Sequence, residues 1–395
     1  MKTYLLLGTL GVALSTSAMA CGGIILLDGE PTGSPDGGPS TPTPSAPVPS
    51  TPTTPTPTPV DCPDTPTTLA SLPGHKAIGL SLGTGFVAVL AEITSASIQK
   101  DLGAERDVQW VPIGSRQAPR ILGPASPLSD AIEARDQLVY FAQGSGPNST
   151  SIVEHDAATG KTRSVSPAVG PFAITGSDIL VATPITDSLP PPQESTITAF
   201  TLGPTSIGPR TIATYSGETT SLSARGNEWG AVLSDGRVAQ GAGSGQALLS
   251  AVRGARGPGR LTASGASFAV HERLTCAEAT CNHARISYFP SPPSNGAQPV
   301  TTPYAEATFT TIQAFFADEK GAVFQAAVAS GEEIRAREAI VTQAGPGGAF
   351  TTRVADIGRQ ATAIHADASC IYWLETDASD PAPGAEITVV RMVKR

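Results

Sequence analysis

Apolar and polar residues alternate along most of the chain in a short unit that recurs seven times. Each copy has an apolar segment, a polar turn of three or four residues and a second apolar segment, as in residues 78–80, 83–85 and 86–89. Such segments, bounded by turn residues, are typical of β-strands. The first segments of the seven copies end at Leu80, Ala134, Ile174, Ala224, Ala263, Ala314 and Ala366. The pattern predicts an all-β chain.

The copies are spaced by about 40 to 50 residues, which is typical of β-propeller blades. Further strand-like segments follow the second segment of several copies, at residues 107–112, 196–200, 285–289 and 386–393. Others lie just before the next copy and are interpreted as its first strand, at residues 120–122, 210–212 and 352–354. We therefore expect one propeller of seven four-stranded blades. A count of six or eight blades, a β-sandwich and two smaller barrels are the alternatives.

The end of the chain carries a family resemblance. Residues 367–373 (DASCIYW) place an Asp-containing turn before a Tyr-Trp strand, and residues 389–394 (VVRMVK) form a closing strand with Arg and Lys. Both segments resemble the blade signature of exported bacterial propellers of the YWTD and NHL types, although Leu374-Glu375 stands where that motif has Thr-Asp. The resemblance implies a propeller, and it does not imply a function because one fold hosts many functions.

The N-terminus has the pattern of an export signal. Lys2 precedes an apolar run at residues 4–14, which is too short to span a bilayer, and residues 18–20 (Ala-Met-Ala) precede Cys21. Simple cleavage would release a soluble protein. Alternatively, residues 18–22 resemble a bacterial lipobox, which implies that Cys21 is lipidated and, with Gly22 after it, that the protein is anchored to the outer membrane. We favour the lipoprotein interpretation and predict a signal peptide at residues 1–20.

A Pro- and Thr-rich segment separates the signal from the repeats. Residues 31–68 contain 13 Pro and 11 Thr among 38 residues and lack Leu, Ile, Phe, Lys and Arg, so they cannot form a packed core. We predict a disordered tether at residues 21–68 and a propeller domain at residues 69–395. The tether is interpreted as a spacer, and an O-glycosylated stalk is the alternative.

The four cysteines after Cys21 are an even number in an exported chain, which predicts disulfides. Cys276 and Cys281 lie close in sequence and are expected to pair locally. Cys62 and Cys370 are then expected to join the start of the domain to its end. A rival interpretation is a metal site made of His271, Cys276, Cys281 and His283, whose spacing matches no familiar zinc pattern.

The sequence lacks the motifs of a nucleophile elbow, a phosphate loop and a zinc protease, and no catalytic residue, metal or cofactor is predicted. His75, His155 and His365 are isolated and are interpreted as surface or packing residues. A net charge of −9 provides no basic surface for nucleic acid.

Loop lengths single out one face of the predicted ring. Loops interpreted as connecting the third and fourth strands of a blade are tight in two copies, at residues 234–236 and 330–332. They are long in five others, at residues 93–106, 143–151, 184–195, 272–284 and 375–385. Insertions gathered on one face mark a binding surface, although unconstrained drift of loop length would give the same pattern. The expected partner is a protein or a glycan.

Together these features predict a monomeric, membrane-tethered propeller of the cell envelope that acts as a non-enzymatic binding or scaffold module. The alternatives are a propeller hydrolase or lyase that acts on a sugar or lactone at the central channel, and a purely structural envelope protein.

The lipid anchor has a direct test. Metabolic labelling with palmitate should mark the wild-type protein and leave Cys21→Ser unlabelled, because the acyl chains are attached at that thiol. Equal labelling of both proteins would contradict the prediction.

Overall fold

The structure is a computed structural model that describes residues 61–395 apart from short internal stretches, of which the longest are 186–193, 275–282, 291–301, 329–336 and 378–385. The predicted signal peptide, Cys21 and the tether up to residue 60 lie outside the described residues. The first strand begins at Thr67, two residues before the predicted start of the domain. No helix among the described residues is long and apolar enough to cross a membrane.

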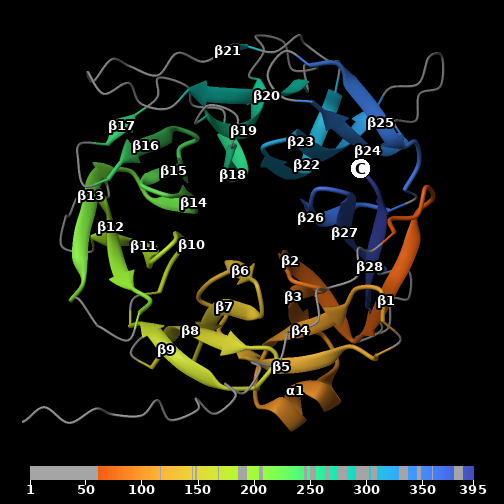
Figure 1. The fold of residues 1–395 in the computed structure, drawn as a ribbon, viewed down its shortest axis with the longest axis horizontal. Helices are drawn as coiled ribbons and strands as arrows, with labels where there is room; N and C mark the ends of the chain where they lie inside the picture. Colours follow the sequence, from red (N-terminus) through yellow and green to blue (C-terminus); the bar gives the residue numbers. More distant parts are fainter. Residues whose placement is uncertain are drawn as a thin grey trace, which may run out of the picture. The chain divides into compact units, whose positions relative to one another are not determined.

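The described strands form antiparallel sheets arranged around one axis (Figure 1). The first sheet holds β2 (His75–Gly83), β3 (Phe86–Ile93), β4 (Arg106–Pro112) and β5 (Arg120–Ala125). The second holds β6 (Ile132–Arg135), β7 (Leu138–Gln143), β8 (Ser151–Asp156) and β9 (Thr162–Ser166). The third holds β10 (Phe172–Ile174), β11 (Asp178–Ile185), β12 (Glu194–Thr201) and β13 (Arg210–Ser216). The fourth holds β14 (Thr219–Arg225), β15 (Glu228–Leu233), β16 (Val238–Ala242) and β17 (Leu248–Leu249).

The remaining strands complete the ring. A larger sheet contains β18 (Ala255–Thr262), β19 (Ser267–Leu274), β20 (His283–Pro290), β21 (Thr302–Pro303), β22 (Phe309–Asp318), β23 (Gly321–Val328), β24 (Arg337–Gln343) and β25 (Phe350–Val354). The last sheet contains β26 (Ala361–Ala366), β27 (Cys370–Asp377), β28 (Ile387–Lys394) and β1 (Thr67–Pro73). The all-β prediction and the single propeller are confirmed.

The sequence predicted seven separate sheets, but the described part of the chain forms six. The reason is one contact between two groups of strands: Ala284 of β20 pairs with Phe309 of β22, which merges eight strands into one hydrogen-bonded sheet. On each side of this contact, β18 to β20 and β22 to β25 follow one another as hairpins, as strands do in the other sheets.

The strand order corrects a second prediction. Residues 120–122, 210–212 and 352–354 lie in β5, β13 and β25, which are the outermost strands of the preceding sheets and not the first strands of the following ones. A short strand that lies between two apolar segments can pair with either of them, and the sequence pattern does not distinguish the two. The long loops that were assigned between third and fourth strands therefore connect second and third strands.

One of those loops contains a helix that was not predicted. Residues 96–102 form α1 (Ala96–Leu102), which ends at Gly103 with a positive φ of 62°. The Gly103 N–H donates to the Gln99 carbonyl, so glycine provides the left-handed residue that closes the last turn.

The second strand of each sheet is buried on both faces, which explains its continuous apolar run. In β3, residues 86–90 are at most 1% exposed. Val87 and Val89 pack with Tyr372 of β27 in one cluster, whereas Phe86 and Leu90 pack in another with residues of β7. Alternate residues of one strand thus bind two neighbouring sheets, and the ring is held together by apolar contacts between sheets.

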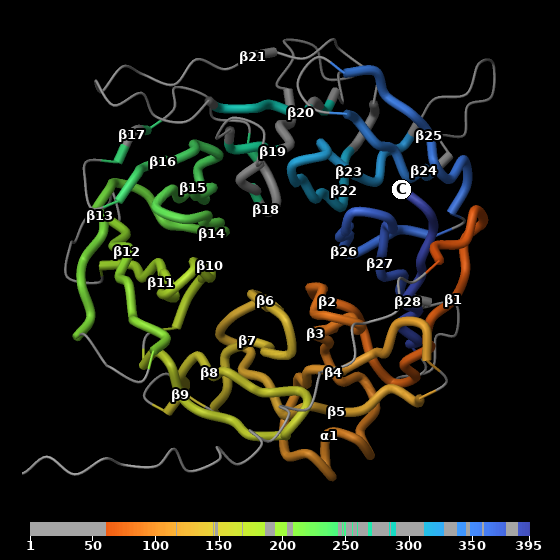
Figure 2. Tube along the Cα trace, in the orientation of Figure 1, coloured from red at the N-terminus to blue at the C-terminus, as the bar shows by residue number. Residues whose placement is uncertain are grey.

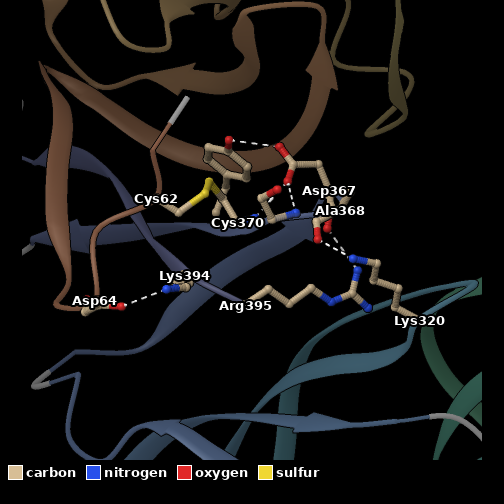
Figure 3. Close-up of a disulfide and its surroundings, with 10 residues drawn as sticks. Cys62, Asp64, Lys320, Asp367, Ala368, Cys370, Lys394 and Arg395 are labelled. Atoms are coloured by element: carbon tan, nitrogen blue, oxygen red, sulfur yellow. Dashed lines mark hydrogen bonds and ion pairs between the residues drawn. A yellow bond between two sulfur atoms is a disulfide. The ribbon is translucent and has the colours of Figure 1, made fainter. Parts of the chain in front are cut away.

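The ring closes where the two ends of the domain meet. β1 pairs with β28 as the fourth strand of the last sheet, and the Lys394 N–H donates to the Pro63 carbonyl at 2.8 Å. The Cys62–Cys370 disulfide, predicted from the sequence, joins the same two regions with a Cα–Cα distance of 5.6 Å (Figure 3). The predicted Cys276–Cys281 bridge lies outside the described residues.

Removing this disulfide tests the closure. Because the cysteines are 308 residues apart, the bond restricts the unfolded chain strongly. Cys62→Ala with Cys370→Ala should lower the free energy of unfolding by about 3 to 5 kcal/mol in a denaturant titration. The matched control is Lys394→Ala, which removes only an exposed ion pair to Asp64 at the same closure and should change stability by less than about 1 kcal/mol. A double alanine variant as stable as the wild type would contradict the prediction.

Candidate functional site

The centre of the ring contains a cavity of about 630 Å³. The innermost strands surround the axis (Figure 2), and most of the lining comes from them. Residues of the lining include Ile78, Gly79 and Leu80 of β2, Ile132 and Glu133 of β6, Phe172 of β10, Thr220, Ser221 and Leu222 of β14, Gln313, Ala314 and Phe315 of β22, and Thr362, Ala363 and Ile364 of β26. A volume of this size is in the usual range of small-molecule sites.

Backbone irregularities aim several side chains at this cavity. In β2, β14 and β26 the pairing with the second strand skips one residue, which is Ile78, Thr220 and Thr362, respectively. The corresponding irregularity of β22 contains Gln313. All four residues line the cavity. Since a β-bulge reorients the residue that it inserts, the repeated irregularity produces a set of bulge residues around the axis.

The two bulge threonines make the same hydrogen bond in two different sheets. The Thr220 hydroxyl donates to the Val232 carbonyl at 3.0 Å, and the Thr362 hydroxyl donates to the Leu374 carbonyl at 3.4 Å. Each hydroxyl proton is therefore used within its own sheet, while the oxygen lone pairs remain able to accept a hydrogen bond.

The inner strands are sheet edges, and side chains of the neighbouring sheet satisfy part of their backbone. The Ala134 N–H donates to Ser81 Oγ and the Ala361 N–H donates to Gln325 Oε1, both at 2.8 Å. The Gly259 N–H donates to Ser221 Oγ at 3.2 Å. These bonds join successive sheets and reduce the number of unpaired edge groups that face the axis.

Two carboxylates line the cavity, and both make bonds within the protein. Asp130 accepts from Arg106 Nη1 at 2.7 Å, and Glu133 Oε2 accepts from the Ile174 N–H at 2.8 Å. Neither residue was predicted as a site residue, because its place in the cavity lining depends on where the closed ring positions β6 and the connection before it. Among the described residues, no group of three His, Cys, Asp or Glu side chains is placed to share a metal ion.

The cavity lies toward the end of the ring at which β15 leads into β16 and β5 leads into β6. Ser234, in the tight turn between β15 and β16, contributes to its lining, as does the connection from β5 to β6 at residues 127–131. Leu128 of this connection is 49% exposed. Among the described residues, two large apolar side chains are exposed, Leu128 and Ile121, the latter at 43%. Of these two, Leu128 lines the cavity and Ile121 does not.

A buried polar cluster lies elsewhere in the first sheet. His75 Nε2 is 3.1 Å from Asp107 Oδ2, which also accepts from Gln109 Nε2 at 2.6 Å. His75 Nδ1 is 2.8 Å from the Pro73 carbonyl. Burial favours the neutral ring, but the hydrogen bond and charge of Asp107 outweigh this effect and raise the pKa of His75. The sequence placed His75 as an isolated residue and missed this cluster, because Asp107 lies 32 positions away.

The other two isolated histidines also have structural contacts. His155 Nδ1 is 2.8 Å from the Thr162 hydroxyl, and the ring of His365 packs on Phe316 with 3.9 Å between ring centroids. Burial and the charge of Arg120 lower the pKa of His155. The metal site considered at His271, Cys276, Cys281 and His283 depends on side chains outside the described residues.

Comparison with known proteins supports the fold. The β-propeller domain of the Trilobed protease from Pyrococcus furiosus is 8% identical, with a TM-score of 0.50 over 78% of this chain and 91% of that one. Pyrococcus horikoshii acylaminoacyl peptidase is 10% identical, with a TM-score of 0.53 over 77% of this chain, and this chain spans about half of the peptidase's length. YCF48 bound to D1 peptide is 8% identical, with a TM-score of 0.48 over 84% and 95%. No protein-family model and no curated protein matches the sequence. The similarities to the two Pyrococcus proteins show a β-propeller fold and no more.

The shifted histidines predict opposite pH dependences. The stabilisation from a raised His75 pKa is complete below the ordinary value of 6.5 and is lost as the pH rises through the higher value of the folded protein. The loss of unfolding free energy in His75→Gln should therefore be larger at pH 5.5 than at pH 8.5.

His155→Gln is the matched comparison, because a lowered pKa stabilises the fold above pH 6.5 and the benefit disappears as the pH falls. Its effect should be larger at pH 8.5 than at pH 5.5. Denaturant titrations at the two pH values measure both differences, and parallel pH profiles for the two variants would refute the assignment.

Proposed function

We propose that this protein is a membrane-tethered, extracytoplasmic propeller that binds a ligand in its central cavity without catalysing a reaction. The observation that carries the proposal is the cavity of about 630 Å³, whose described lining is mostly apolar and includes the exposed Leu128. An apolar cavity with a few placed polar groups is the usual form of a small-molecule site.

The Cys62–Cys370 bond supports export. Disulfides persist in oxidising compartments and are rare in the cytosol, so a bond that closes the ring is consistent with folding outside the cytoplasm. A lipid on Cys21, followed by the Pro- and Thr-rich tether, would hold the ring near the outer membrane as a monomer.

We also propose that the merged sheet represents two blades, which makes seven. The inner strand β18 contacts β14 on one side and β22 on the other, and β22 contacts β26. Thus β18 and β22 occupy successive positions around the axis, just as the inner strands of separate sheets do. The proposed resemblance to YWTD and NHL propellers concerns the last of these blades.

A binding role is favoured over the hydrolase or lyase alternative. Such an enzyme needs several carboxylates or histidines that converge on the axis, commonly around a metal. The two described carboxylates of the cavity bond to Arg106 and to the backbone of Ile174, which gives them structural roles. A protein or glycan partner of the long-loop face would reach the same end of the ring.

Leu128→Asp tests the cavity with a neutral fluorescent probe, N-phenyl-1-naphthylamine. The full chain carrying Cys21→Ser avoids acyl chains and detergent, which would compete for the probe. Adding Leu128→Asp should weaken probe binding at least tenfold, since a charge then replaces an apolar contact at the cavity.

The matched control is Ile121→Asp, which introduces the same charge at the other exposed apolar residue, away from the cavity. It should bind the probe as the parent does. Failure of the parent to bind, or equal losses in the two variants, would overturn the proposed cavity site.

A further inference from the structure

Hydrogen-bond acceptors dominate the polar atoms that the cavity presents. The hydroxyl protons of Thr220 and Thr362 are used by strand carbonyls, and the Ser129 hydroxyl donates to the Gly170 carbonyl. Asp130 and Glu133 are carboxylates, which accept only when they are ionised. Ser221 accepts from a backbone N–H and so retains a proton that it can donate.

Gln313 adds an acceptor without a partner. Its Oε1 atom is buried and has no hydrogen-bond partner among the described residues, while the residue belongs to the cavity lining. An unpaired buried carbonyl is unfavourable, and turning the amide toward the cavity would let this oxygen meet a donor. The same bulge position in β14 and β26 holds the two threonines, so the three acceptors come from equivalent places in three inner strands.

The charged residues of the cavity lining restrict the class of ligand further. The described lining residues contain the carboxylates of Asp130 and Glu133 but no Lys, Arg or His, so an anion would meet like charge with no basic group among them to pair with. Apolar residues such as Leu80, Leu128 and Phe172 supply the rest of the surface.

We infer that the central cavity selects an apolar molecule that donates hydrogen bonds and carries no negative charge, such as an apolar alcohol, phenol or amine. The bulge residues Thr220, Thr362 and Gln313 are its specificity determinants. This inference rests on the proposed function, because it names the ligand class of the same cavity.

Three competitors of nearly equal shape test the chemistry. Displacement of N-phenyl-1-naphthylamine from the full chain carrying Cys21→Ser is measured with 4-tert-octylphenol, its methyl ether and 4-tert-octylbenzoate. The phenol should displace the probe at least fivefold more effectively than the ether, which has no donor, and at least tenfold more effectively than the benzoate, which is an anion.

Two variants connect this preference to the bulge residues. Thr220→Val with Thr362→Val removes both acceptors at almost constant volume and should bring the phenol-to-ether ratio close to one. Thr342→Val is the matched control, since the Thr342 hydroxyl also donates to a strand carbonyl, that of Thr351, but lies outside the cavity lining. It should keep the parent's ratio. Gln313→Met provides an independent variant, which should lower the ratio even if the double variant does not fold.

The outcomes separate the inference from the proposed function. If the parent binds the probe and Leu128→Asp abolishes binding, but the phenol, ether and benzoate compete equally, the ligand class is wrong while the cavity site stands. If the parent does not bind the probe at all, both fail. A phenol preference that survives in the threonine variant and in Gln313→Met would overturn the role of the bulge residues.

Discussion

Closure of the ring is the constraint on which the rest of this structure depends. Each second strand is buried on both faces only because a sheet lies on either side of it, as Val87 and Phe86 illustrate by packing into different clusters. An open ring would expose one such face at each end. Pairing of β1 with β28, together with the Cys62–Cys370 bond, removes both ends at once. Closure therefore allows every sheet of the ring to bury the apolar residues on both faces of its second strand.

A closed ring also creates the site. Its inner strands cannot pair with a further strand, so they leave edges around the axis, and side chains such as Ser81 and Gln325 satisfy backbone groups of the neighbouring sheet. Bulges at Thr220 and Thr362 then direct polar side chains to the same space, where the hydroxyl protons are already used. The cavity is thus mostly apolar and has more hydrogen-bond acceptors than donors, because the bulge hydroxyls of the edge strands donate their protons to carbonyls of their own sheets.

The sequence pattern was most informative where burial is local. The apolar run of β3 and its turn were visible because they alternate within a few residues, and the Asp367 turn was visible before Tyr372 for the same reason. The pattern was wrong about strands such as β5, whose pairing partner depends on which neighbouring edge is available. It also missed β1. The predicted Cys62–Cys370 bond linked this region to the end of the chain, but the pattern of apolar residues near Thr67 does not show which strand it pairs with.

By itself, the sequence determined the all-β class, the propeller architecture and the Cys62–Cys370 bond. Repeated alternation reflects contacts that each repeat makes in the same way, and an even number of cysteines in an exported chain indicates disulfides. Only the tertiary structure decided which strand closes the ring, how the sheets merge at Ala284 and Phe309, and which side chains meet at the axis. These features join residues from different repeats. Their positions follow from the curvature and closure of the whole ring, which no local pattern of hydrophobic residues encodes.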